Sequence, residues 1–469
     1  MSPFLPIQLL CPPPLEPGFT PAVLWNRAFR ERVGESGDPR PFGVALEQPD
    51  GTVSVYETAV LPETDPAAAE LNLRYVEHLV KFLLWQRGGH RLILGGSDSL
   101  TKAIADRYSP DGERSFDFHF MGEKAYRRPF EVTGVAYADL PASREAAVEL
   151  GGHLDGCRIG FDLGGSDRKC AAVIDGEVVF SEEVPWDPYF QSDPQYHLDG
   201  IRHSLRRAAE HLPRIDAIGG SAAGVYVNNE VRVGSLFRGV PDDVFEKQVR
   251  RMFFDLQAEW NGVPFVVVND GDVTALAGSM STGDTGVLGV AMGTSEAVGF
   301  VTPGGRITTW LNELAFAPID FREDAPADEW SGGRGVGAQF LSQQAVGRLA
   351  PAAGYEFPDE MGLPERLIEV QKAMEAGESG AADIFKTIGR DFGYAVAHYA
   401  DYYDIRQILA LGRVTSGAGG DLLLNEAKDV LATEFPELAE KIQFRQPGEK
   451  EKRHGQAIAA ASLAALKKS

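Results

Sequence analysis

A glycine turn between two apolar strands is the sequence feature that most constrains how this chain folds. One apolar stretch ends at residue 163, and a second begins at residue 170 and runs to an Asp-Gly turn at 175–176. The polar and glycine positions of the segment are Asp162, Gly164, Gly165, Ser166 and Lys169. Glycines let backbone N–H groups approach phosphate oxygens, and a carboxylate at a strand end can hold Mg²⁺ through water. The segment therefore predicts a β-hairpin that carries a phosphate-binding loop, with an ordinary Gly-Gly hairpin as the alternative.

This pattern differs from the two commonest phosphate motifs. In the Walker loop and the dinucleotide fingerprint the glycines join a strand to a helix, whereas here they join two strands. The chain is also acidic, with 68 Asp and Glu residues against 45 Lys and Arg residues and a formal net charge of −23. That charge argues against nonspecific binding to nucleic acid or to an anionic membrane, because both need a basic surface. A nucleotide would have to be bound locally, through Mg²⁺ and backbone N–H groups.

Length and cysteine content narrow the class of protein. With 469 residues, the chain is long enough for two or three domains. Its three cysteines form no C-x-x-C pair, which excludes a disulfide scaffold and favours a reducing compartment. The first 20 residues lack a basic region and are broken by prolines, unlike a secretory signal, and no run reaches the roughly 18 apolar residues of a membrane helix. We expect a soluble, cytoplasmic protein.

Residues 1–150 are predicted to form a small α/β domain of unknown role. Their first 20 residues are rich in proline and are expected to lie on a domain as an extended arm. Residues 42–61 alternate between apolar and polar around a Pro-Asp-Gly turn, which predicts two strands. The elements expected next are a helix at 67–86, a strand at 91–96 and a helix at 97–108.

From residue 156 the pattern is that of two α/β lobes with a cleft between them. The first lobe is expected to span residues 156–285 and the second residues 286–469. Strands are predicted at 215–219, 264–268, 286–292 and 407–411, helices at 198–211, 241–260 and 422–434, and a helical region at 339–403. A helix of small residues at 454–466 could cross between the lobes.

The pair Asn269-Asp270 follows the apolar strand 264–268 and precedes an expected helix. The carboxyl end of a strand, beside the start of a helix, is where α/β folds present catalytic groups. Either residue could instead only cap the helix, although capping and catalysis can coexist.

Two further glycine turns lie in the second half of the chain. The turn after strand 286–292 could supply backbone and hydroxyl donors to phosphates from across the cleft. The turn after strand 407–411 has glycines that would admit the adenine and ribose of a nucleotide. The residues concerned are Gly293, Thr294 and Ser295 in the first turn and Gly417, Gly419 and Gly420 in the second. A plain hairpin and a plain strand-to-helix turn are the alternatives.

Taken in order, these four segments resemble the motifs of the actin-like ATPase superfamily, and most closely those of the ROK sugar kinases and their repressor relatives. The resemblance covers roughly two-thirds of the chain. It implies an α/β, two-lobed actin-like ATPase (ribonuclease H-like) fold with an additional N-terminal α/β domain. It also implies that the glycine turns and Lys169 bind ATP, that Asp162 holds Mg²⁺, and that Asp270 accepts the proton of a sugar hydroxyl while Asn269 orients the sugar.

The chain departs from the ROK pattern at several positions. The second phosphate motif of the family reads Gly-Thr-Gly-x-Gly-Gly-Gly, whereas here Ser295, Glu296, Ala297 and Val298 stand before Gly299. Asp272 replaces an Asn of the catalytic segment. Glu313 is retained from the family's Gly-Glu-x-Gly-His motif as a sugar ligand, but Phe316 stands in place of its His.

The segments that bind the sugar in the ROK family differ even more in this chain. Residues 332–340 align with the family's zinc-binding Cys cluster but contain no Cys or His, so no zinc is expected. The sugar-binding Glu that follows this cluster in the family falls near Ala338 or Gln339. The resemblance puts Ser235 at the position of the family's Asn sugar ligand. The sugar-binding residues that it implies are Asn269, Asp270, Glu313 and Ser235.

The resemblance implies an ATP- and Mg²⁺-dependent carbohydrate kinase that phosphorylates a hydroxyl of a sugar or sugar derivative. The alternative is a noncatalytic ROK-like sensor or regulator that binds a sugar or a nucleotide. ROK repressors carry an N-terminal winged-helix domain, whereas residues 1–150 contain strands and no evident basic recognition helix, which counts against DNA binding. A structural ATPase like actin is disfavoured by the match at Asn269-Asp270. The expected partner is a small-molecule sugar, without nucleic acid or membrane, and a homodimer is possible.

Overall fold

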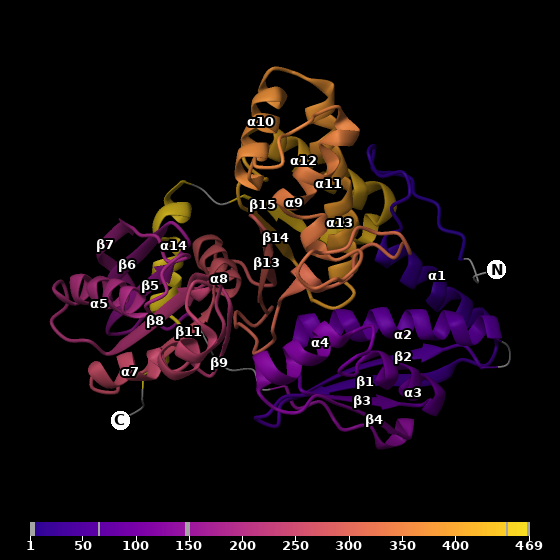
Figure 1. The fold of residues 1–469 in the computed structure, drawn as a ribbon, viewed down its shortest axis with the longest axis horizontal. Helices are drawn as coiled ribbons and strands as arrows, with labels where there is room; N and C mark the ends of the chain where they lie inside the picture. Colours follow the sequence, from indigo (N-terminus) through magenta and orange to yellow (C-terminus); the bar gives the residue numbers. More distant parts are fainter. Residues whose placement is uncertain (1–4, 64–65, 146–150, 447–448, 467–469) are drawn as a thin grey trace.

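The computed structural model describes residues 5–63, 66–145, 151–446 and 449–466, which form a mixed α/β protein with four sheets (Figure 1). Three bodies lie around a common junction. They are the N-terminal unit (residues 22–145), the first lobe, built on the five-stranded sheet, and the second lobe, built on the sheet that contains β12–β15.

The N-terminal unit has a four-stranded sheet in the order β2-β1-β3-β4. Its elements are α1 (Ala22–Glu35), β1 (Arg40–Glu47), β2 (Val53–Val60), α2 (Pro66–Arg87), β3 (Arg91–Gly95), α3 (Asp98–Arg107), α4 (Ser115–His119), a π-helix (Phe120–Tyr126) and β4 (Glu131–Val135). The predicted strands and helices between residues 42 and 108 are confirmed. Helix α1 and strand β4 were not predicted.

The first lobe contains a five-stranded sheet in the order β11-β8-β5-β6-β7. Its elements are β5 (Cys157–Leu163), β6 (Asp167–Ile174), β7 (Glu177–Pro185), α5 (Gln195–Ala209), β8 (Ala217–Ala222), β9 (Val225–Val227), β10 (Glu230–Val233), α6 (Asp242–Val244), a π-helix (Phe245–Val249), α7 (Met252–Glu259), β11 (Phe265–Asn269) and α8 (Asp270–Thr282). Strands β5, β8 and β11 are parallel, and β5 and β6 form the predicted antiparallel hairpin. The single helix predicted at 241–260 is broken, because a π-helical turn separates α6 from α7.

The second lobe has a four-stranded sheet in the order β13-β12-β14-β15, covered by helices (Figure 1). Its elements are β12 (Val287–Met292), β13 (Glu296–Val301), α9 (Gln343–Leu349), α10 (Leu363–Glu375), α11 (Ser379–Tyr399), β14 (Gln407–Leu411), α12 (Gly417–Glu434), α13 (Pro436–Lys441) and β15 (Gln443–Arg445). The last long helix of the lobe begins at Gly417, five residues before the predicted start, so the whole glycine segment belongs to its first turn.

Helix α14 (Glu449–Ala461) returns to the first lobe, as the expected crossing helix would. It lies on β5 and β8 at Gly160 and Gly219, where any side chain would collide with the helix backbone. The buried Arg158 guanidinium donates to the carbonyl oxygen of Ala464 at 2.6 Å. Small residues on both surfaces therefore let this helix approach the sheet closely.

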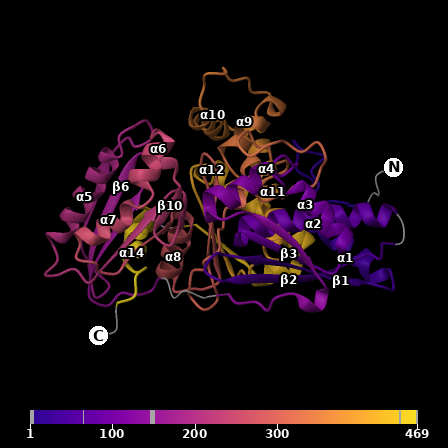
Figure 2. The ribbon, with the colours of Figure 1, turned by 60° about the horizontal axis from the view of Figure 1, so that its bottom comes forward.

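The N-terminal unit and the second lobe share one hydrophobic core, the sheet of the first lobe has its own, and α8 of the first lobe packs against β12–β14 of the second lobe in a third cluster. Phe82 of α2 stacks on Tyr402 with ring centroids 4.2 Å apart, and Trp85 packs against Phe316 at 4.5 Å. Figure 2 shows the first lobe set apart on one side of these two bodies. Burial of shared apolar surface therefore anchors the N-terminal unit to the second lobe.

The proline-rich start of the chain lies on the second lobe, as expected for an extended arm. The Leu10 N–H donates to Glu434 of α12 at 2.6 Å, and Arg390 of α11 donates to the Pro12 carbonyl oxygen at 2.6 Å. Glu16 accepts hydrogen bonds from both Arg322 and Arg348. Within the described residues, no helix is both long enough and apolar enough to span a membrane.

Candidate active site

The carboxyl ends of β5, β8 and β11 bring the predicted catalytic groups to one edge of the first-lobe sheet. Asp162 lies opposite Ser221 in the β5–β8 register, and Asn269 lies opposite Ala222 in the β8–β11 register. Asp270 is the next residue and the first of α8. Asp162 and Asn269-Asp270, which are more than 100 positions apart in the sequence, are thus two strands apart on the same edge.

Asp162 is nearly buried, with 5% of its surface exposed. Burial raises the pKa of its carboxyl, against the opposing influence of the neighbouring Ser221 hydroxyl and the Lys169 ammonium. The Lys169 Nζ lies 3.9 Å from the Asp162 Oδ2 and 3.1 Å from the Asp167 Oδ1. A carboxylate that is paired with one cation and partly desolvated in this way is suited to a second, divalent cation.

The glycine turn 164–166 is held in place by the segment that follows β7. The Trp186 indole N–H donates to the Gly164 carbonyl oxygen at 2.7 Å, and the Trp186 backbone N–H donates to Ser166 at 3.0 Å. A side chain at Gly165 would collide with the Tyr189 hydroxyl. The predicted phosphate loop is therefore held by hydrogen bonds within the fold, and a side chain at position 165 would have to displace the Tyr189 ring.

Asn269 caps α8. Its Oδ1 accepts from the Gly271 N–H at 2.7 Å, and its Nδ2 donates to the Gly224 carbonyl oxygen at 2.7 Å. The capping interpretation of this residue is thus confirmed, and one amide proton is left over for a ligand.

Asp270 is half-buried, and its pKa is raised to about 6, first by burial and then by the negative charge of Asp162.

Two more carboxyls lie near Asp270. Burial raises the pKa of Asp272 to about 7 and that of Glu313 to about 8, and Asp270 adds to both shifts. The Asp272 Oδ1 accepts from the Asn312 Nδ2 at 3.0 Å, and the Asn312 Oδ1 accepts from the Tyr403 hydroxyl at 2.9 Å. Asp272, whose role the sequence left open, therefore connects α8 to the segment that carries Glu313.

The second lobe presents its two glycine turns side by side. Strands β12 and β14 are parallel neighbours, and the Val414 N–H donates to the Met292 carbonyl oxygen at 3.3 Å. Thr294 and Ser295 are exposed at the β12–β13 turn. Their hydroxyl and backbone donors are therefore free to meet a ligand in the cleft.

The three glycines of the last turn differ in their surroundings. Gly417 has a φ of 67° and open space around it. Gly419 and Gly420 instead pack against the Phe385 ring and the Thr415 backbone, where a side chain would collide. Packing within the protein explains Gly419 and Gly420 without a nucleotide, so their predicted role in nucleotide binding remains a prediction.

Glu296 is the main difference from the ROK motifs within the second lobe. Only 3% of its surface is exposed, its Oε1 accepts from the Tyr399 hydroxyl at 3.0 Å, and its Oε2 is buried with no hydrogen-bond partner among the described residues. Burial raises its pKa to about 8. The carboxyl lies against Gly337, next to Ala338 and Gln339, where the family's sugar-binding Glu was expected.

Two other residues singled out from the sequence, Ser235 and Phe316, lie apart from the carboxyls of Asp270 and Glu313. Ser235 is exposed and begins a short 3₁₀ turn, and no contact joins it to Asp270 or Glu313 in the described part of the chain. Phe316, in the position of the family's His, is buried between Trp85 and Trp330. Within residues 5–63, 66–145, 151–446 and 449–466, no cluster of three or more His, Cys, Asp or Glu side chains is arranged to hold a metal ion.

The residues still fit Mg²⁺, which needs few protein ligands when nucleotide phosphates and water complete its shell. Asp162 offers such a ligand at the edge of the sheet, close enough to Asp270 to shift its pKa. Glu296, Asn312, Tyr399 and Tyr403 form hydrogen bonds close to these carboxyls, and the sequence assigned none of them a role. A signal for Asn312 was that it replaces the first glycine of the family's Gly-Glu-x-Gly-His motif.

We compared the chain with protein families, with curated proteins and with solved structures, and matches came from the solved structures. No protein-family model matches the sequence, and no curated protein matches it. The structure of the ROK hexokinase from Thermus thermophilus matches with a TM-score of 0.52 and 20% identity, over 66% of this chain and 97% of the hexokinase chain.

Two other structures match with TM-scores below 0.5. A ROK family glucokinase from Streptomyces griseus, solved with glucose and AMPPNP, has 20% identity over 66% of this chain and 99% of its own, with a TM-score of 0.47. A ROK family transcriptional regulator, a homologue of the E. coli MLC protein, has 17% identity over 66% of this chain and 79% of its own, with a TM-score of 0.49.

These likenesses leave a third of the chain outside the match, which is consistent with an additional N-terminal unit. At 20% identity they bear on the fold and not on the activity. The resemblance to the ROK family that the four motifs predicted is therefore confirmed for the fold. About two-thirds of this chain has the ROK fold in a divergent form.

Proposed function

We propose that the protein transfers the γ-phosphoryl group of ATP to a hydroxyl of a sugar or sugar derivative. The observation that carries this proposal is the state of Asp270. Its carboxyl stands at the sheet edge with a pKa raised to about 6 by burial and by Asp162. A general base works best when its pKa lies near the working pH, because it is then mostly ionised and still basic enough to take a proton.

The proposed step is an in-line displacement. The Asp270 carboxylate accepts the proton of the acceptor hydroxyl as that oxygen bonds to the γ-phosphorus, and the bond to the bridging oxygen of ADP breaks. The products are ADP, the sugar phosphate and one proton. When bound at Asp162, Mg²⁺ would neutralise charge on the phosphates.

Two lobes are proposed to hold the nucleotide. The turn with Gly164, Gly165 and Ser166, together with Lys169, contacts the phosphates from the first lobe. The turn with Gly293, Thr294 and Ser295 contacts them from the second, and the start of α12 receives the adenosine. Asn269, through its remaining amide proton, and Glu313 are the proposed sugar ligands near Asp270, with Ser235 a more distant one.

The direct test is ADP release by the wild-type protein. Each of a panel of neutral and charged sugars is added with Mg-ATP, and ADP formation is followed by a coupled assay, with sugar phosphate confirmed by mass spectrometry. We expect at least one sugar to raise ADP release well above the background without sugar. If every sugar leaves ADP release at background, the kinase proposal is wrong.

The sensor alternative is favoured by one feature, the buried Glu296 beneath the second phosphate turn. Its carboxyl fills the space against Gly337, which would hinder close contact with a phosphate. A sensor would bind sugar or nucleotide with no turnover. Retention on DNA at low salt would distinguish a DNA-binding regulator from other sensors.

The remaining expectations are part of the same proposal. We propose that residues 1–150, 156–285 and 286–469 are the three domains, with α14 packed on the first lobe. A cytoplasmic location is supported by Cys11, Cys157 and Cys170, which are free thiols. The absence of zinc and the formation of a homodimer remain predictions, to be checked by metal analysis and light scattering.

A further inference from the structure

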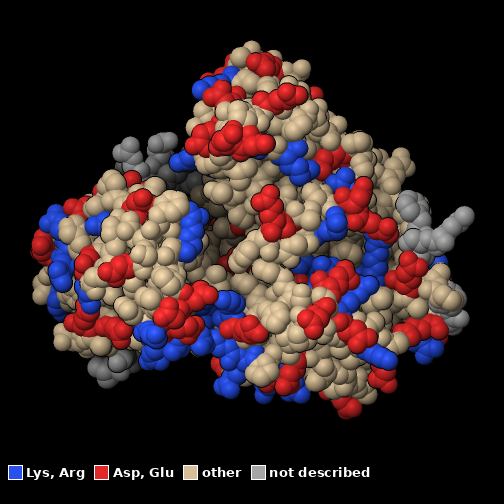
Figure 3. All heavy atoms as spheres, in the orientation of Figure 1, with Lys and Arg blue, Asp and Glu red and all other residues tan. Residues whose placement is uncertain are grey.

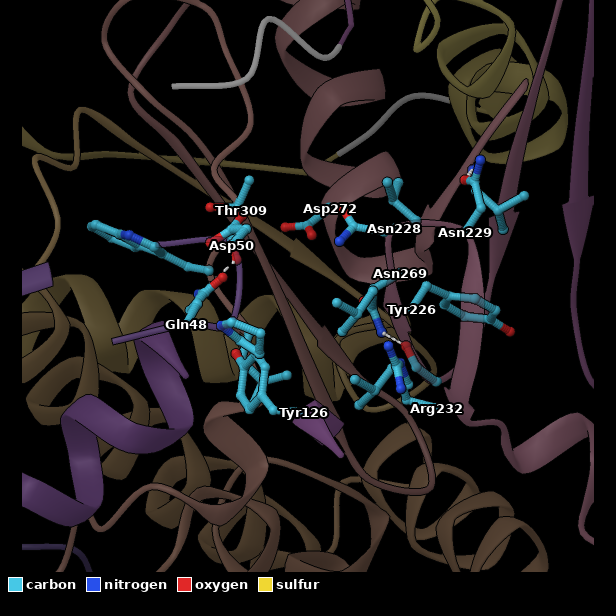
Figure 4. A pocket seen from close by; sticks show the side chains of 18 of the residues that line it. Gln48, Asp50, Tyr126, Tyr226, Asn228, Asn229, Arg232, Asn269, Asp272 and Thr309 are labelled. Carbon is cyan, nitrogen blue, oxygen red and sulfur yellow. Dashed lines mark hydrogen bonds between the residues drawn. The ribbon is translucent and has the colours of Figure 1, made fainter. Parts of the chain in front are cut away.

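A cavity of about 650 Å³ lies where the N-terminal unit meets the two lobes. Asn269 and Asp272 line it from the proposed active site, and Thr309 from the second lobe. The N-terminal unit adds the β1–β2 turn with Asp50 and the segment that ends its π-helix, with Arg127. Figure 4 shows Asp50 and Thr309 on one side of the cavity, Asn269 and Arg232 on the other, and Asp272 between them.

The cavity is larger than a single hexose needs, because pockets of 300–1,000 Å³ hold drug-sized molecules. Part of its wall comes from the N-terminal unit, which is anchored to the second lobe by the shared core. Across the mouth, Arg127 pairs with Glu246 of the first lobe at 2.6 Å. Closure of the lobes would therefore also close this cavity around an acceptor bound at Asn269.

Arginines dominate one wall. Arg127, Arg128 and Arg232 line the cavity, and Arg250 and Arg251 lie beside it. Among the described residues, two carboxylates form ion pairs with these arginines. Glu230 lies within 4 Å of Arg232, Arg250 and Arg251, and Glu246 contacts Arg127 and Arg250. Positive charge at this wall exceeds its local compensation.

Two of these arginines have unused donors. Arg128 is exposed, and its guanidinium makes no hydrogen bond or ion pair with the described part of the chain. Arg232 has only 12% of its side chain exposed, and its Nε–H is buried with no partner among the described residues. The Arg232 Nη2 already pairs with Glu230 at 2.9 Å, so an anion in the cavity would contact the remaining exposed part of this guanidinium together with Arg128.

The two carboxyls in the cavity do not cancel this charge. Asp272 accepts from Asn312 and has a pKa raised to about 7 by burial, so it carries only part of a negative charge at neutral pH. Asp50 is exposed and accepts from the Thr52 N–H at 2.9 Å. Figure 3 shows Lys and Arg side chains gathered where the first lobe meets the N-terminal unit. In a chain with a net charge of −23, such a basic patch at the mouth of a cavity would attract anions locally.

We propose that this cavity binds an oxyanion group, a carboxylate or a phosphate, carried by the sugar derivative whose hydroxyl reaches Asp270. Arg128 and Arg232 are the residues that recognise the anion, and the N-terminal unit completes the cavity. Guanidinium groups bind both kinds of oxyanion through paired N–H donors. The inference rests on the proposed function for the identity of the reacting hydroxyl, whereas the anion site itself does not depend on turnover.

Calorimetry without nucleotide tests the anion site apart from catalysis. The probes are glucose, gluconate, glucose 6-phosphate and inorganic phosphate, titrated into the full-length protein. We expect gluconate or glucose 6-phosphate to bind at least tenfold more tightly than glucose and more tightly than inorganic phosphate, with affinity falling as salt is added. The sugar anion that binds more tightly identifies the group as carboxylate or phosphate.

Charge-removing variants assign the residues. Arg128→Gln and Arg232→Gln should each weaken the preferred anionic sugar about tenfold and leave glucose unchanged. The matched control is Arg32→Gln, because Arg32 is exposed on α1, does not line the cavity, and has no ion pair with a described residue. Arg128 is exposed, so its variant is expected to fold even if Arg232→Gln does not.

Equal affinity for glucose and both sugar anions, or wild-type affinity in Arg128→Gln, overturns the inference. Inorganic phosphate that binds as tightly as the sugar anions would also overturn it, because the sugar would then play no part. ADP release with glucose, combined with anionic sugars that bind no more tightly than glucose, would reject the anion site but keep the kinase. Tight binding of an anionic sugar that is lost in Arg128→Gln, without ADP release, would keep the anion site and reject the kinase.

Discussion

The Glu313 backbone N–H donates a hydrogen bond of 2.9 Å to the Trp85 carbonyl oxygen. The neighbouring Asn312 N–H donates to the Gln86 carbonyl oxygen at the same distance. Both acceptors lie in the last turn of α2, where helix carbonyls have no partner within the helix. The end of α2 therefore holds the segment that carries Glu313, so the N-terminal unit positions a carboxyl of the proposed active site.

Phe316→Ala should weaken this attachment. Phe316 lies between Trp85 and Trp330 and is 8% exposed, and loss of a buried Phe side chain costs about 3 kcal/mol or more of unfolding free energy. We expect urea denaturation to show that loss and, with a substrate in hand, the sugar KM to rise more than kcat falls. Phe190→Ala is the control, because Phe190 is 78% exposed. Unchanged stability and KM in Phe316→Ala would contradict the anchoring role.

Asp270→Asn should abolish the proposed base while keeping the shape of the site. We expect kcat to fall about 10²–10⁴-fold with little change in sugar or Mg-ATP binding. In the wild type the base is active when ionised, so kcat should rise with pH through about 6 and then level off. A variant that keeps near-normal turnover, or a wild-type rate that does not change between pH 5 and 7, would remove Asp270 from this role.

Asp162→Asn tests the Mg²⁺ ligand and its electrostatic link to Asp270. Mg-ATP affinity should fall at least tenfold in calorimetry, because a carboxylate ligand becomes an amide. The negative charge of Asp162 raises the pKa of Asp270, so the acid limb of any remaining kcat profile should move to lower pH. Asp199→Asn, on the exposed face of α5, should change neither quantity.

The sequence predicted the parts of the site that are local. Asp162 with its glycine turn and Asn269-Asp270 each lie within a few residues of a strand end, and parallel strands bring their carboxyl ends to one edge. The pairing of Asp272 with Asn312 spans 40 positions, and that of Asn312 with Tyr403 spans 91. Contacts of such range depend on how the lobes pack, and no short pattern encodes them.

The N-terminal unit was only partly predictable for the same reason. Strands β1, β2 and β3 and helix α2 follow from apolar patterning and helical spacing and were found as expected, whereas α1 and β4 were not predicted. Its packing on the second lobe depends on residues such as Phe82 and Trp85, which look like ordinary core residues of a helix until Tyr402 and Phe316 are placed beside them. The cavity at the junction could not be foreseen, because its walls come from all three bodies.

Asn312 replaces a glycine of the family pattern, and its φ of 53° lies in the left-handed region that favours glycine or asparagine. Asn312→Gly should keep this backbone but lose the hydrogen bonds to Asp272 and Tyr403, at about 1–3 kcal/mol of unfolding free energy. Asn312→Ala should cost about 1 kcal/mol more, because a Cβ is strained at this φ. Equal stabilities of the two variants in urea denaturation would rule out backbone strain as a factor.

Glu296 should make the protein less stable as pH rises. Burial raises its pKa to about 8 in the folded state, against about 4.3 in an unfolded chain. Between these two pH values the folded state keeps the proton and the unfolded state has lost it. The contribution of Glu296 to the free energy of unfolding is therefore fully present below about pH 4.3 and falls by about 1.4 kcal/mol per pH unit until pH 8. Asp272 and Glu313, also raised, act in the same direction.

Glu296→Gln should therefore flatten the dependence of stability on pH. Glutamine keeps the oxygen that accepts from the Tyr399 hydroxyl and stays neutral at every pH, much as the buried, protonated glutamic acid does at pH 6. We expect similar unfolding free energies for variant and wild type at pH 5 and a more stable variant at pH 8, measured by urea denaturation. Glu375→Gln, on the exposed face of α10, should follow the wild type. If Glu296→Gln instead lost stability equally at both pH values, the carboxyl would be ionised in the folded protein, and the second phosphate turn would lie above a buried negative charge.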